Sequence, residues 1–184
     1  MNVVRFLIGV VLFGSSLTFA QAQRKYAVQS GQIHFTSNAE LELIKASSPQ
    51  VRGLLDPANN QFAFTIEVKT FKGFNGELQR EHFNEKYMEV EKYPRVSFSG
   101  KIIEQVDFSR PGVHEVRAKG DLDVHGVKQT RIIKSKLTVA ADGVRIEARF
   151  MVPLADHNIT IPTVVSQKIA TEIDVEFTAA MVLQ

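Results

Sequence analysis

The chain has 184 residues and no Cys, with 22 Lys and Arg against 20 Asp and Glu, for a formal net charge of +2. Charges of both signs are interspersed, which excludes the basic stripe of a nucleic-acid-binding protein, so we expect no nucleic-acid partner. Without Cys the protein has no disulfide and no Cys to carry a lipid anchor, so the packing of one domain must supply its stability.

The first 22 residues have the pattern of a secretory signal peptide. Arg5 precedes the apolar run 6–13, and Ala20-Gln21-Ala22 resembles a cleavage site. The run is short for a membrane span. We therefore predict a signal peptide at 1–22, cleavage near Ala22, and a mature domain at 23–184 that is periplasmic or secreted without a stable membrane anchor. A retained N-terminal anchor helix is the alternative.

The first clear strand pattern covers 61–69, after a turn signal at 57–60. Apolar and polar residues alternate there, which predicts a strand with one buried face and one wet face. The following segment, 71–76, holds two Phe and two Gly. It fits either a flexible lid over a barrel mouth or a connection whose rings plug the barrel end.

The alternation stops between Glu77 and Lys92, where charged residues surround a few large apolar side chains. This composition predicts a short helical segment near 77–90, with Asn84 as a candidate N-cap. Tyr93-Pro94 should end the helical segment, because the residue before a proline disfavours helix.

Strand alternation returns at 96–102, 115–124 and 171–179, and His125-Gly126 and Pro111-Gly112 mark turns. Asp142-Gly143 lies between two further alternating runs and predicts a two-residue type I′ hairpin. Its register would pair Ala141 with Val144, Val139 with Ile146, Leu137 with Ala148 and Ile133 with Val152. The chain is thus all-β apart from one short helical segment, and the strand pattern fits both a sandwich and a barrel of about eight strands.

Several short motifs resemble the YceI-like family. They are Glu81-His82-Phe83-Asn84-Glu85, then Tyr93-Pro94 with Phe98, and then the strand 120–124 running into His125-Gly126-Val127. Ile33-His34-Phe35 and Gly53 stand where the family has its first two strands, so the resemblance spans residues 26–183. The segment 153–162 differs from the Arg-Asp-Phe-Gly-like stretch of many members.

The resemblance implies an extended antiparallel, lipocalin-like β-barrel whose apolar cavity takes a long-chain isoprenoid lipid, such as a polyprenyl chain or an isoprenoid quinone. It implies no other cofactor, and because some family members are dimers it leaves a homodimer open. The expected function is that of an exported, soluble lipid carrier. An exported interaction module with a filled core and no lipid ligand is the alternative.

The candidate cavity-lining residues are mostly aromatic, and Phe is frequent, at 13 residues, whereas Trp is absent. The same residues would equally form a filled core, since pockets and cores share an apolar composition. The candidates are Phe35, Phe62, Phe64, Ile66, Phe71, Phe74, Phe83, Phe98, Leu122, Val124 and Phe150.

No sequence pattern predicts catalysis or a metal site. The nucleophile elbow, the zinc-protease motif and the phosphate-binding loop are all missing from the sequence. The five His have no metal-ligand spacing, and a structural hydrogen bond is the expected role of His125. Asp156 and His157 would point to opposite faces of a strand. Strand parity places Arg131 on the inner side with Ile133, either near a ligand head group or turned to solvent by a bulge.

Overall fold

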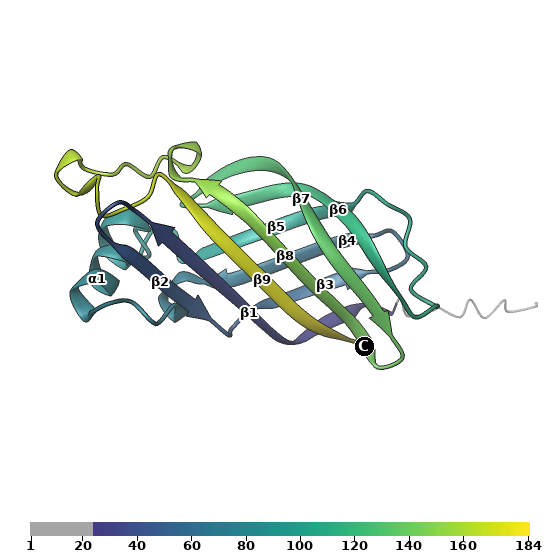
Figure 1. The fold of residues 1–184 in the computed structure, drawn as a ribbon. Coiled ribbons are helices and arrows are strands. Elements are labelled where there is room, and N and C mark those ends of the chain that lie inside the picture. Colours follow the sequence, from purple (N-terminus) through teal and green to yellow (C-terminus); the bar gives the residue numbers. More distant parts are fainter. Residues whose placement is uncertain (1–23) are drawn as a thin grey trace, which may run out of the picture.

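The computed structural model describes residues 24–184, which form an elongated antiparallel β-barrel with a helical segment across one end (Figure 1). The predicted signal peptide lies outside these residues. Within residues 24–184, no helix has both the length and the hydropathy needed to cross a bilayer. The strands are β1 Tyr26–Asn38, β2 Leu43–Ser48, β3 Arg52–Asp56, β4 Gln61–Glu67, β5 Arg95–Ile102, β6 Gly112–Val124, β7 Val127–Ala140, β8 Gly143–Pro153 and β9 Glu172–Leu183.

The barrel wall follows the alternation of the sequence. In β6, Val116, Ala118 and Leu122 are buried inside, whereas the intervening Arg117 and Lys119 are exposed. Such alternation suits an antiparallel sheet with one buried face. The predicted strands at 96–102, 115–124 and 171–179 are confirmed. The predicted strand 61–69 ends two residues early, because Val68–Thr70 turns away from the wall as a 3₁₀ helix, η1.

Nine strands occupy eight positions around the barrel. β1 closes the barrel by pairing with β9, and its other edge is shared by β2 and β3. The pairs Ile33–Ser48 and Tyr26–Leu55 belong to one register, so β2 and β3 are one strand position interrupted after Ser48. Pro49 stands at the interruption, and proline has no N–H for the ladder. The prediction of about eight strands is therefore confirmed.

The predicted register of the β7–β8 hairpin is wrong by two residues. Ala140 pairs with Gly143, Val139 with Val144, and Leu137 with Ile146. Parity is preserved, so the apolar residues still share the inner face. The turn residues Ala141 and Asp142 are not among the described residues with positive φ, which a type I′ turn requires at both positions. Gly143 is instead a strand residue, at φ 149°, where a Cβ would lie 2.1 Å from the Met181 carbonyl oxygen.

The type I′ conformation occurs at the β6–β7 turn. His125 and Gly126 have φ values of 53° and 71°, and Val124 pairs directly with Val127. A Cβ on Gly126 would lie 2.4 Å from the Tyr93 ring. Position 126 therefore requires glycine for two reasons, its positive φ and the close contact with the Tyr93 ring.

The predicted helical segment has two parts: α1, Glu77–His82, and a π-helical turn, η2, Phe83–Tyr87. Asn84 is not an N-cap, because α1 begins after Gly76 and Asn84 lies within η2. The prediction that the helical segment ends before the strand that starts at Arg95 is confirmed. Two 3₁₀ helices, η3 Leu154–His157 and η4 Thr163–Val165, lie in the segment between β8 and β9.

β5 and β6 approach each other closely where Gly100 faces Gly120. A Cβ at Gly120 would lie 2.2 Å from the Ser99 carbonyl oxygen, and one at Gly100 would lie 2.1 Å from that of Lys119. Real Cβ atoms do not come so near backbone oxygen, so both positions require glycine.

Candidate functional site

The barrel interior has an open half and a filled half. The open half is a chamber of about 570 Å³ beneath α1 and η2, a volume typical of ligand pockets. Side chains from the barrel strands, from the helical segment and from the segment between β8 and β9 surround it. Representative lining residues are Phe35, Phe71 and Phe83 from the first half of the chain, and Val124, Leu154 and Ile159 from the second.

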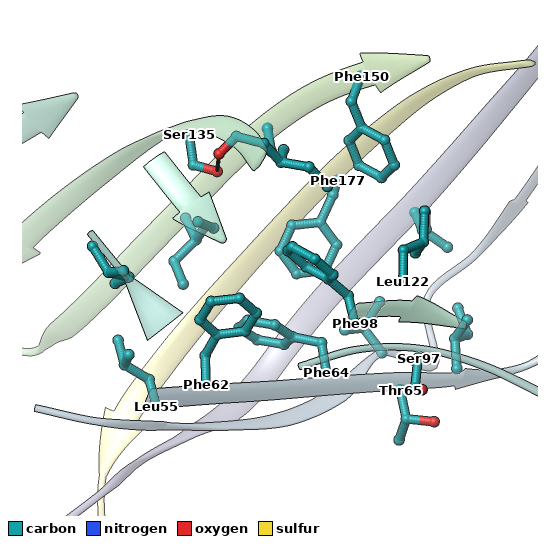
Figure 2. A pocket seen from close by; sticks show the side chains of 18 of the residues that line it. Leu55, Phe62, Phe64, Thr65, Ser97, Phe98, Leu122, Ser135, Phe150 and Phe177 are labelled. Atoms are coloured by element: carbon teal, nitrogen blue, oxygen red, sulfur yellow. Dashed lines mark hydrogen bonds between the residues drawn. The ribbon is translucent and has the colours of Figure 1, made fainter. Parts of the chain in front are cut away.

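The other half is closed by aromatic rings. Figure 2 shows Phe62, Phe64, Phe98 and Phe177 gathered between the strands. Their ring centroids are 5.0 Å apart for Phe62 and Phe98 and 5.1 Å apart for Phe64 and Phe177, which are ordinary packed aromatic separations. Only about 90 Å³ of free space remains there. This half is therefore a core rather than a container.

The chamber and the small cavity share part of their lining, which we call the neck. Five residues line both the chamber and the small cavity: Ile33, Ile66, Val96, Leu122 and Phe150. Ile66 of β4 pairs with Val96 of β5. Because the neck is entirely apolar, a chain that enters it meets no polar group.

All of the predicted lining residues border one of the two spaces. Phe62, Phe64 and Phe98 line the small cavity; Phe35, Phe71, Phe74, Phe83 and Val124 line the chamber; Ile66, Leu122 and Phe150 line both. Sequence reasoning missed Ile44 of β2, as well as Leu154, Ile159, Val165 and Ile169 of the β8–β9 segment. That segment has no regular alternation, so its apolar content was the only signal in the sequence that it could line a cavity.

The 71–76 segment is part of the chamber wall. The Ser47 N–H donates to the Lys72 carbonyl at 2.8 Å, and the Lys72 N–H donates back at 2.9 Å. The Phe71 ring packs 5.4 Å from that of Phe35, and the Phe74 ring packs 5.0 Å from that of Phe83. The backbone pairing fastens the segment to β2, while its rings narrow the chamber without filling it.

Polar groups of the chamber gather at one rim, where the β1–β2 turn meets the start of α1. Glu42 Oε1 accepts hydrogen bonds from Gln79 Nε2 at 2.8 Å and from Asn75 Nδ2 at 3.3 Å. The Asn75 N–H donates to Gln79 Oε1 at 3.0 Å. The rim is thus a small connected network around one carboxylate.

His125 holds together three elements beside the chamber. Its Nδ1 lies 3.1 Å from the His157 carbonyl oxygen, and its Nε2 lies 2.7 Å from Glu89 Oε2. Both partners offer acceptor oxygens, so the ring links the β6–β7 turn to two other parts of the chain. Glu89, His125 and Asn158 all have positive φ, so backbone strain concentrates at this junction.

The hydrogen bond from His125 holds the pKa of Glu89 below its ordinary value, with Lys92 contributing in the same direction. A carboxylate with a lowered folded-state pKa adds stability above its unfolded pKa and loses that contribution as pH falls through the folded value. Glu89→Gln should therefore lower the urea midpoint at pH 6, and the difference from the wild type should vanish near pH 2. Lys92→Gln is the control, because it removes the weaker interaction partner of Glu89. A difference that persists at pH 2 would contradict this assignment.

Asp156 and His157 have separate hydrogen-bond partners. They lie in η3 rather than on a strand, so the strand argument for their separation does not apply. Asp156 instead accepts a hydrogen bond from Arg131, and the fully buried His157 places Nδ1 3.0 Å from the Val127 carbonyl oxygen. Arg131 is thus tied to the β8–β9 segment rather than turned freely to solvent. Within residues 24–184, no three His, Asp or Glu side chains converge as metal ligands would.

Comparison with known proteins agrees with this architecture. The sequence model of the YceI-like domain matches residues 14–181. A polyisoprenoid-binding domain from Saccharophagus degradans superposes with a TM-score of 0.70 at 13% identity, covering 86% of this chain and 98% of that one.

Two further solved structures have the same fold. BcnA of Burkholderia cenocepacia gives a TM-score of 0.68 at 14% identity, covering 82% of this chain and 95% of its own. The YCEI protein of Campylobacter jejuni gives 0.56 at 16% identity, covering 78% and 88%. No curated protein sequence matches the chain.

Proposed function

Since the chain belongs to the YceI-like family, we propose that it is an exported carrier holding a long-chain isoprenoid lipid, polyprenyl or quinone-like, in the chamber beneath α1. The observation that carries the proposal is the chamber itself, about 570 Å³ of mainly apolar space that shares the apolar residues of the neck with the small cavity. The polyisoprenoid-binding domain with the same fold supports the ligand class.

The binding energy of such a ligand requires no polar chemistry in the interior. Burying several hundred Å² of apolar chain at roughly 25 cal/mol per Å² contributes on the order of 10 kcal/mol. Ordering a flexible chain and immobilising it offset a large part of that gain. The Phe side chains of the lining supply contact area without unpaired polar atoms.

The alternative, an exported interaction module with a filled core, describes only half of the interior. The ring cluster around Phe62 and Phe98 is such a core. The chamber is what distinguishes the two hypotheses, because an interaction module has no need of an apolar cavity on this scale.

The test is to express the full chain in a Gram-negative host and purify the protein from the periplasm and the medium. We expect an intact mass that corresponds to a start near Gln23, and a long-chain isoprenoid in the organic extract analysed by mass spectrometry. Protein stripped of lipid should take up added polyprenol or quinone. Processed protein that contains no amphiphile and takes up neither ligand would exclude the carrier function.

A further inference from the structure

The chamber is apolar except where the β1–β2 turn, the start of α1 and the 163–170 segment meet. Two hydrogen bonds join the 163–170 segment to β1 and the β1–β2 turn: the Leu41 N–H donates to the Gln167 carbonyl at 2.8 Å, and the Ala170 N–H donates to Ser37 Oγ at 2.9 Å. A lipid whose chain occupies the neck would leave its head group at this polar rim.

Glu42 is the acidic side chain of the chamber lining. Its Oε1 receives amide hydrogen bonds from Gln79 and Asn75, so the carboxylate is held in place rather than free to swing into solvent. Both amide groups direct an N–H toward the carboxylate, and those N–H groups are not available to an anionic ligand.

The positive charge at the rim only balances Glu42. Lys168 and His82 are the basic side chains of the described lining, which contains no arginine. Lys86 Nζ lies 3.1 Å from His82 Nε2, and His82 is counted as neutral in the formal charge. One carboxylate and one ammonium give the described lining a formal charge of zero.

Such a rim offers few favourable contacts to a diphosphate head group. Proteins bind phosphate oxygens with Arg or Lys clusters or with several free backbone N–H groups, through charge-assisted hydrogen bonds. Removing a multiply charged group from water without such partners is costly, and a nearby carboxylate adds repulsion. A hydroxyl or a quinone ring has neither problem.

We propose that the chamber selects isoprenoid lipids with an uncharged polar head over polyprenyl diphosphates, and that Glu42 is the residue that discriminates. This inference rests on the proposed lipid-carrier function. Glu42 accepts a hydrogen bond from a hydroxyl head and repels a phosphate, and Lys168 donates to a carbonyl head.

The experiment compares a polyprenol, an isoprenoid benzoquinone and a polyprenyl diphosphate of equal chain length, each titrated into lipid-free protein. The wild type should bind the two uncharged ligands at least about tenfold more tightly than the diphosphate. Glu42→Gln keeps the oxygen that Gln79 and Asn75 contact and removes the charge, so it should raise diphosphate affinity about tenfold. Glu40→Gln removes a carboxylate outside the chamber lining, two residues away, and should change none of the three affinities.

Equal or tighter diphosphate binding by the wild type would overturn the head-group inference alone. An equal change of diphosphate affinity in Glu42→Gln and Glu40→Gln would also overturn the inference, because it would mean that only general surface charge matters. Failure of all three ligands to bind any of the proteins would overturn lipid carriage, and the inference with it.

Discussion

Replacing Val96 with Trp should lower the affinity for a long-chain isoprenoid at least about tenfold, or about 1.4 kcal/mol, while leaving the barrel folded. Val96 borders both cavities beside its cross-strand neighbour Ile66, so an indole there should occupy space where the chamber approaches the small cavity. The neighbouring chamber offers room for the larger side chain, which limits the overpacking cost. Titration with polyprenol measures the affinity, and thermal melting by circular dichroism checks the fold.

Val113→Trp is the matched control. Val113 is on the outer face of β6 and is 61% exposed, so the same ring there should affect neither ligand nor fold. Because the natural chain contains no Trp, each variant has a single indole fluorophore. The emission of the Val96→Trp variant should lie at shorter wavelength than that of the Val113→Trp variant and should respond to ligand. Unchanged affinity in the folded Val96→Trp variant would show that the ligand does not use the neck.

Gly120→Ala should destabilise the protein by about 3 kcal/mol, at the upper end of ordinary overpacking effects. The added methyl group would meet the Ser99 carbonyl oxygen at 2.2 Å, and backbone cannot move aside as a side-chain tip can. β5 and β6 would have to separate where Gly100 and Gly120 face each other. Urea unfolding followed by circular dichroism gives the free energy directly.

Gly112→Ala tests the same substitution in the same strand, where the nearest neighbour is a side chain rather than backbone. Its Cβ would come no nearer than 3.3 Å to any atom beyond its chain neighbours, and that atom is the ring nitrogen of His114. We expect a change within about 0.5 kcal/mol. Equal effects at both positions would indicate a general cost of alanine in β6 rather than a close contact between strands.

Much of the barrel wall was predictable because period-two alternation follows directly from strand geometry. Residues 115–124 are an example, since each inward side chain of β6 was assigned to the correct face. The family resemblance then favoured a barrel over a sandwich. The alternation also survived the error at residues 141–144, because a slip of two residues keeps every side chain on its face.

The division of the interior was beyond the sequence because Phe62 and Phe35 have the same side chain and both pack against other rings. Phe62 lies in the filled half, whereas Phe35 borders the chamber. Only the three-dimensional placement of the segment after β8 determines where that space lies. Ile159 and Val165 line it from a stretch with no strand or helix periodicity, so nothing local indicated which way they point.

The interruption of one strand position at Pro49 has a consequence for how the molecule opens. One edge of β2 forms a ladder with β1. Within residues 24–184, the backbone pairing on its other edge is the single bridge between Ser47 and Lys72. Opening this panel of the chamber therefore breaks few backbone hydrogen bonds, whereas opening β6 breaks ladders on both edges. Partial openings of this kind cost less than global unfolding. β2 is therefore the strand whose local opening should expose the chamber at the lowest cost in backbone hydrogen bonds.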